Sequence, residues 1–106
     1  MKSDSTENSE LFSGLIRLHV LHHAAEGSLY GQWMIAELAR HGYRISPGTI
    51  YPMLHAMERK GYLKSSLQGT GRRARRIYRA TLKGRKALAF AKDRVRELFG
   101  ELVEGR

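Results

Sequence analysis

The spacing of the apolar residues changes twice along this chain. Up to about residue 60, apolar side chains recur at steps of three and four residues, as in helices with one buried face. Between residues 63 and 81 the period changes to two on both sides of the sequence GTG at 69–71, which predicts a short hairpin. The helical spacing then returns. The chain is therefore predicted to be mainly α with one small β-hairpin.

Three predicted helices precede the hairpin and one follows it. They cover about residues 10–25, 31–41, 47–60 and 82–103. Thr81 is a suitable N-cap for the last helix. An isolated hairpin is only marginally stable in water, so this one must pack on the helices through residues such as Leu63 and Tyr78. Three helices, a basic hairpin and a further helix form the layout of a winged helix-turn-helix.

The length and the residue types limit what kind of protein this is. The 106 residues suffice for one domain with a modest core. We predict a disordered tail over 1–9, a winged helix-turn-helix domain over 10–81 and a C-terminal dimerisation helix over 82–106. The absence of cysteine excludes disulfides, thiolate catalysis and cysteine-ligated zinc. Without a signal-peptide core or a membrane-spanning apolar run, we expect a cytoplasmic protein with no membrane partner.

The net charge of +9 is concentrated in one segment. Residues 57–86 carry eleven basic side chains and one acidic one, whereas the segments on either side are close to neutral. A mixed run of charges is usually a solvated surface, but this run is almost purely basic and rich in arginine, which favours a polyanionic partner. A membrane surface is the weaker alternative, because the segment lacks the wide apolar face of an interfacial helix.

The sequence SPGTIYPML at 46–54 holds both prolines of the chain. Ser46 precedes a proline and so favours the extended backbone of an N-cap, and Pro47 fits the first helical turn. The helix N-terminus at Gly48 can then receive a phosphate. Pro52 cannot donate a hydrogen bond to the carbonyl of Gly48, so we expect a slightly splayed first turn.

The predicted third helix has an apolar face and a polar face. The apolar face holds Ile50, Leu54 and Met57, and the opposite face holds Thr49, Pro52, His55 and Arg59. In a winged helix the third helix enters the major groove of DNA. A proline on that surface can contact a thymine methyl.

Three motifs resemble the PadR-like transcriptional regulators. They are GSLYGQWMIAEL at 27–38, ISPGTIYPMLHAMERKGYL at 45–63 and GRRARRIYRATLKGRKAL at 71–88, and the resemblance runs from about Leu15 to Leu88. The second motif is the most specific, and it is similar to the recognition helix of that family nearly residue for residue. The chain departs from the family pattern at Tyr30, where a histidine is frequent, and at Gln32, where an aromatic residue is common. The single short C-terminal helix is similar to the small subgroup of the family.

The resemblance implies a homodimeric winged-helix repressor that binds an inverted-repeat operator in double-stranded DNA and is released by a small-molecule effector. The residues expected to contact DNA are Ser46, Pro47, Gly48, Thr49, Tyr51, Pro52, His55 and Arg59 around the third helix, and Lys64, Arg72, Arg73, Arg75 and Arg76 in the hairpin. The hairpin cations would supply phosphate affinity, and the helix would supply register and base contacts. Each assignment has an alternative. The hairpin, which we call the wing, could carry its arginines only for solubility, and the Tyr51 ring could pack on the first helix instead of contacting DNA.

Other function classes fit the sequence less well. It contains no paired carboxylates in a cleft pattern, no nucleophile elbow and no phosphate loop, so we expect neither an enzyme nor a cofactor. The alternative function is a winged-helix protein-interaction module without DNA specificity, which would bind its partner independently of salt. RNA is disfavoured because the stacking aromatics of an RNA platform are missing.

The last predicted helix carries an apolar stripe with steps of three and four residues. Its members are Leu88, Ala91, Val95, Leu98 and Leu102. Such a stripe suits either packing on the chain's own core or pairing with a second copy of the helix. We favour a dimer interface, because the first three helices and the hairpin already form a closed unit.

Two further groups could bind ligands. His19, His22 and His23 lie on one helix, and His19 and His23 have a spacing that can chelate a metal. Since no nearby carboxylate or cysteine completes the set, we interpret them as an ordinary helix face. Trp33 lies beside the apolar stripe of the second helix, where it is a core edge, an interface residue or a wall of an effector pocket.

Overall fold

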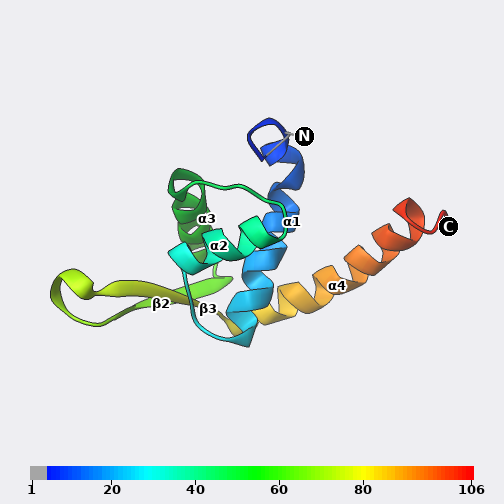
Figure 1. The fold of residues 1–106 in the computed structure, drawn as a ribbon. Helices are drawn as coiled ribbons and strands as arrows, with labels where there is room; N and C mark the ends of the chain where they lie inside the picture. Colours follow the sequence, from blue (N-terminus) through cyan, green and yellow to red (C-terminus); the bar gives the residue numbers. More distant parts are fainter. Residues whose placement is uncertain (1–4) are drawn as a thin grey trace.

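The computed structural model describes residues 5–106 and contains four α-helices and a small antiparallel sheet (Figure 1). The helices are α1 (Ser5–Glu26), α2 (Gly31–Arg40), α3 (Pro47–Arg59) and α4 (Leu82–Leu102), and the strands are β1 (Leu29–Tyr30), β2 (Leu63–Gln68) and β3 (Arg75–Ala80). A short 3₁₀ turn over Gly71–Arg73 lies between β2 and β3. The predicted class, mainly α with a β-hairpin, is confirmed.

Helix α1 begins earlier than the sequence predicts. It starts at Ser5, within the segment 1–9 predicted as a tail, and residues 1–4 lie outside the described residues. The predicted start near residue 10 rested on apolar spacing, and a polar turn adds no member to an apolar stripe. The other three helices agree with their predicted bounds within one or two residues.

The sheet has three strands in the order β1-β3-β2, one more than the predicted hairpin. Strand β1 pairs with β3 through Leu29 opposite Tyr78 and Tyr30 opposite Ile77. A strand of two residues is too short to show alternation, so the sequence pattern could not reveal it. Because β1 connects α1 to α2, it attaches the base of the hairpin to the helices.

The core lies between the first three helices and the base of the sheet. Its largest fully buried side chains are Ile16, Val20, Met34, Leu38, Ile50, Leu54, Leu63 and Tyr78. Leu63 and Tyr78 bring the hairpin onto the helices, as the sequence predicts. Beyond them the hairpin projects from one side of the helical body, and α4 projects from the other (Figure 1).

Helix α3 ends in a turn that requires a glycine. Gly61 has a positive φ of 86°, and its N–H donates to the carbonyl of Glu58 while the N–H of Tyr62 donates to Met57. This pair of hydrogen bonds is the Schellman motif, in which the left-handed residue is usually glycine. The turn directs the chain from α3 into β2, so it sets the position of the hairpin relative to the helix.

The start of α4 packs closely on that same turn. The Thr81 hydroxyl accepts a hydrogen bond from the N–H of Gly84 at 3.0 Å, which confirms the predicted N-cap. A Cβ atom added at Gly84 would overlap the backbone oxygen of Tyr62 and would lie 3.2 Å from a methyl carbon of Leu21. Glycine is therefore needed here for close approach, not for its backbone angles.

Replacing Gly84 with alanine should destabilise the fold. Since the overlapping atom belongs to the backbone, the turn or the helix must shift, and we expect a loss of about 2 kcal/mol and a drop of roughly 10 °C in the thermal midpoint. The control is Gly14→Ala, at an exposed position of α1 with no atom within 4 Å of the added Cβ. That change should raise the midpoint slightly, because alanine favours the helix. Equal midpoints for the two variants would contradict the close contact.

Helix α4 has an internal partner along its first half. Its residues Ala87 and Leu88 pack against the core, and Leu88, Ala91 and Val95 face Leu15 and Leu18 of α1 across a groove of about 460 Å³. The expectation that the first three helices and the hairpin form a closed unit without this helix is therefore wrong for its first half, which packs on α1. No helix in residues 5–106 is both long and apolar enough to cross a membrane.

Candidate nucleic-acid interface

The outer face of α3 has the composition that the sequence predicts. Thr49, Pro52, His55 and Arg59 are exposed, whereas Ile50, Leu54 and Met57 are buried. The helix thus presents a hydroxyl, a proline ring, an imidazole and a guanidinium along one solvent-facing side.

The N-terminus of α3 is built by the backbone of Ser46. This residue has the extended conformation of an N-cap, with φ −89° and ψ 162°, and its carbonyl accepts hydrogen bonds from Thr49 and Ile50 at 3.0 Å. Its hydroxyl makes no cap and lies 3.4 Å from the Thr49 hydroxyl instead. Ser46, Pro47, Gly48 and Thr49 are all exposed, so the positive end of the helix dipole is open to an anion.

Tyr51 is placed differently from the other predicted contact residues. It is half-buried, and its ring lies so close to Gly31, the first residue of α2, that a Cβ atom there would overlap the ring. The ring therefore packs on the first residue of α2, a contact that the sequence analysis did not consider. This contact connects α3 to the start of α2.

The tip of the hairpin carries the arginines. Arg72 and Arg73 lie in the 3₁₀ turn, and Arg75 and Arg76 begin β3, all four of them exposed. The Arg75 guanidinium lies 4.7 Å from the centre of the Tyr30 ring, and the Tyr30 hydroxyl donates to the side-chain oxygen of Gln68. The tyrosine that departs from the family pattern thus connects both strands of the wing.

A chain of hydrogen bonds connects the hairpin to α3. Arg76 donates to the Ser65 hydroxyl at 3.0 Å, and Ser65 donates through its hydroxyl (2.8 Å) and its N–H (3.2 Å) to one carboxylate oxygen of Glu58. Glu58 belongs to α3, Ser65 to β2 and Arg76 to β3. These hydrogen bonds therefore hold the hairpin in a defined position relative to α3.

The sequence analysis did not predict two basic side chains that lie near α3. Arg17 and Arg44 line a cleft between α1 and the first turn of α3, together with Ser46, Thr49 and Pro52. Arg17 comes from the middle of α1, so only the tertiary structure brings it to this cleft. Arg44 stands two residues before the N-cap, where its charge could have been noticed.

The predicted dimer residues divide into two groups. Leu88 and Ala91 are partly covered by α1, whereas Val95, Leu98 and Leu102 are 45%, 45% and 72% exposed. The exposed apolar side chains also include Phe99 at 50% and Val103 at 66%, which do not belong to the predicted stripe. The second half of α4 thus carries a large unpartnered apolar face.

The histidines of α1 face the end of α2. The ring centres of His19 and His41 are 4.8 Å apart, and burial, followed by the charge of His41, lowers the pKa of His19 below 6.5. His23 Nε2 lies 3.3 Å from a carboxylate oxygen of Glu37, and the Trp33 ring stands edge-on to His23. Trp33 is 46% exposed and lines neither the cleft nor the groove described above. The hydrogen bond from His41 is the main cause that lowers the pKa of Glu37.

The known proteins that are similar to this chain are transcriptional regulators. The model of the transcriptional regulator PadR-like family matches residues 20–90. The chain is 50% identical over 91 residues to the transcriptional regulator Rv3488 of Mycobacterium tuberculosis. The aligned region covers 86% of this chain and 85% of the relative.

Solved structures share the whole architecture, including α4. A PadR family transcriptional regulator from Eggerthella lenta superimposes with a TM-score of 0.78 at 30% identity, over 96% of this chain and 93% of the other. A PadR-like transcription factor from Bacteroides fragilis gives a TM-score of 0.79 over 95% and 99% of the two chains. At 19% identity this second likeness concerns the fold alone.

Proposed function

This chain belongs to the PadR-like family of transcriptional regulators, and we propose that it represses transcription as a homodimer bound to a two-fold symmetric operator. In this proposal the outer face of α3 reads the major groove, and the wing holds the neighbouring phosphates. A small-molecule effector would release the complex, as the family resemblance implies.

The observation that carries the proposal is the fixed pairing of two exposed surfaces of different chemistry. The outer face of α3 offers groups that can contact base edges, and the arginines of the hairpin offer sequence-independent charge. The hydrogen bonds between Arg76, Ser65 and Glu58 hold these surfaces in one arrangement. Arg17 and Arg44 would add phosphate contacts beside the N-terminus of α3.

A dimer would supply the symmetry that an inverted repeat requires. The exposed apolar face on the second half of α4 is the surface we assign to the partner, since such faces are usually covered in a protein complex. In a two-fold dimer the recognition helices would stand about 34 Å apart, one turn of DNA.

The test is a binding assay at several salt concentrations on the DNA upstream of the protein's own gene, combined with footprinting. We expect a protected two-fold symmetric site and an affinity that falls steeply with salt. A partner bound independently of salt, without any protected site, would favour the protein-interaction module instead.

Pro52 provides a sharper test of the α3 surface. Pro52→Ala restores a backbone hydrogen bond in the helix interior, so the thermal midpoint should rise. Operator affinity should nevertheless fall by about tenfold, because the proline ring is lost from the proposed groove-facing side. Pro47→Ala is the control for stability alone: a proline at the first helical position removes no hydrogen bond, so its replacement should leave the thermal midpoint nearly unchanged. An unchanged operator affinity of Pro52→Ala would show that this proline has only a structural role.

A further inference from the structure

A group of metal-ligating side chains lies between the end of α1 and the end of α2, away from the proposed DNA surface. His23 and His41 both point a ring nitrogen at the same carboxylate oxygen of Glu37, at 3.3 Å for His23 and 3.0 Å for His41. The three candidate ligand atoms all lie within 4.8 Å of one another. The expectation that no nearby carboxylate accompanies the histidines of α1 is wrong: Glu26 lies four residues after His22 on the same helix, and α2 contributes Glu37.

The distances fit a small transition-metal ion. Zinc binds histidine nitrogen and carboxylate oxygen at about 2.0–2.2 Å, so two ligands of a tetrahedral site stand about 3.3 Å apart. The two His–Glu37 separations are close to that value before any ion is bound. The two histidine nitrogens lie within 4.8 Å of each other, so the imidazole rings would have to turn for all three ligand atoms to reach one ion.

The surroundings of Glu37 orient it for this role. Arg40 donates to the other carboxylate oxygen at 2.7 Å, which leaves the oxygen shared by the two histidines turned toward them. The Glu37 side chain is only 9% exposed, whereas His41 is 43% exposed, so an ion could enter from the solvent side. The rings of His19 and Trp33 pack against His41 and His23 and limit their rotation. Such outer contacts typically tune metal affinity.

We propose that His23, Glu37 and His41 form a binding site for one divalent transition-metal ion, with zinc the best fit, and with water as the fourth ligand. Two imidazoles and one carboxylate with an open position are a ligand set that zinc uses in proteins. Calcium and magnesium prefer a shell of oxygen ligands, and this set offers one carboxylate and two nitrogens. A bound ion would connect α1 to the C-cap of α2, five residues before the N-cap of α3.

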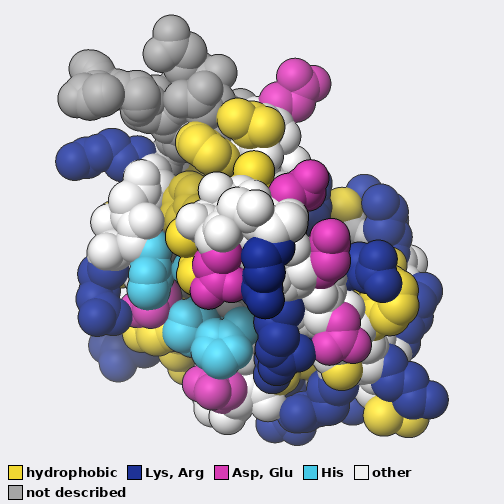
Figure 2. Space-filling view, turned by 90° about the vertical axis from the view of Figure 1, so that its right-hand side faces the viewer, with side chains coloured by type: hydrophobic (Ala, Val, Ile, Leu, Met, Phe, Trp, Pro, Cys, Tyr) yellow, Lys and Arg dark blue, Asp and Glu magenta, His cyan; other side chains and the backbone are white. Residues whose placement is uncertain are grey.

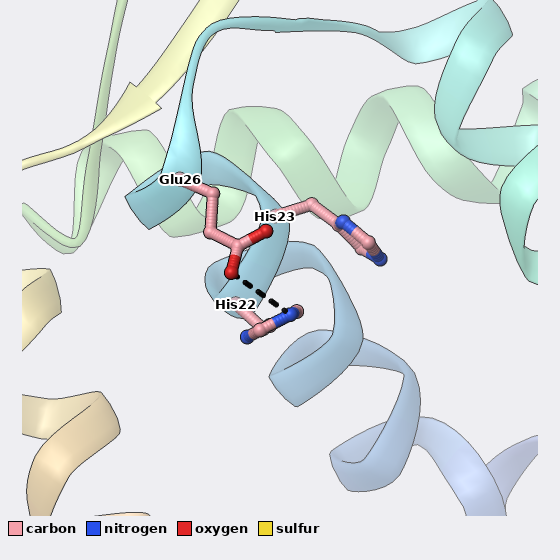
Figure 3. A group of neighbouring side chains, drawn as sticks. All are labelled: His22, His23 and Glu26. Atoms are coloured by element: carbon pink, nitrogen blue, oxygen red, sulfur yellow. Dashed lines mark ion pairs between the residues drawn. The ribbon is translucent and has the colours of Figure 1, made fainter.

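A second group on the same face is a weaker site. His22, His23 and Glu26 also lie within reach of one another, and Figure 2 shows histidine and acidic side chains gathered on this side of the molecule. Figure 3 shows His22 and Glu26 facing each other, with the ring of His23 extending away from them. The His22–Glu26 pair is 3.6 Å apart, and its side chains are 47% and 66% exposed, so it is less enclosed than the group around Glu37. His23 is already directed at Glu37.

Zinc binding by the full chain tests this proposal. Titration calorimetry with zinc chloride in a non-coordinating buffer at pH 7.5 should show one saturable ion per chain. His41→Ala should weaken that binding by at least about tenfold. His22→Ala is a matched control, because its side chain is 47% exposed and belongs only to the second group. It should leave the affinity unchanged.

A thermal measurement separates loss of the site from loss of the fold. Zinc should raise the thermal midpoint of the unmodified chain, since a ligand that binds only the native state stabilises it. It should not raise the midpoint of His41→Ala or of Glu37→Gln, which keeps the side-chain shape but removes the charge. Absence of saturable zinc binding overturns the proposal. So does binding that His22→Ala removes and His41→Ala leaves intact.

Discussion

Replacing Arg72, Arg73, Arg75 and Arg76 with alanine should weaken binding to every DNA sequence alike. Each phosphate contact contributes about 0.9 to the slope of log affinity against log salt, so losing four should flatten that slope by roughly 2 to 4. At 0.1 M salt the affinity should drop on the order of 10²–10³-fold. The ratio of operator to nonspecific affinity should change little, because these side chains lie on the wing and not on the outer face of α3.

The same loss of charge elsewhere provides the control. Arg85, Lys86, Lys92 and Arg94 are exposed cations of α4, outside the proposed DNA surface. Replacing these four with alanine lowers the net charge equally and should leave most of the affinity and the salt slope in place. If both variants lose the same affinity, general attraction by net charge explains the binding, and the wing has no special role.

Leu98→Glu combined with Leu102→Glu should convert the proposed dimer into a monomer. Both side chains are substantially exposed within one chain, so the double variant should keep its fold, whereas two pairs of like charges would oppose each other across a dimer interface. Sedimentation velocity should then report a monomer at micromolar concentration. Operator affinity should fall on the order of 10²-fold, since the two half-sites would no longer be bound by one linked molecule.

Leu82→Glu is the matched control for that double variant. Leu82 is 69% exposed at the near end of the same helix and does not belong to the apolar stripe. It should leave both the sedimentation coefficient and the operator affinity unchanged. A double variant that remains dimeric would show that the partner covers a different surface.

Most of the fold could be predicted from the spacing of residues along the chain. Helix α3 and the hairpin were found because their apolar residues follow clear periods and glycines stand at their ends. The first turn of α1 and the two-residue strand β1 were missed. Neither carries a local pattern: the polar start of α1 offers no apolar residue to count, and β1 exists only because β3 pairs with it.

The candidate sites were likewise predictable where their residues are continuous in sequence, and not where they come from different elements. The sequence identified the exposed face of α3 and the basic hairpin, since both are continuous in sequence. Three contacts could not be predicted from the sequence. Tyr51 packs against Gly31, Arg17 lies beside the start of α3, and Glu37 lies near both His23 and His41. Each of these is a contact between different elements, and no spacing along one helix encodes it.

The helices, the hairpin and the location of the positive charge could be read from the chain alone, because they follow from local backbone preferences, from the period of apolar residues and from composition. The family could be identified because three continuous motifs resemble it. The arrangement of these parts required the folded chain: Glu58 and Ser65 set the position of the hairpin relative to α3, and His23, Glu37 and His41 meet from two helices. The physical reason is that packing of the common core sets the distances between elements, and those distances depend on all the buried side chains at once.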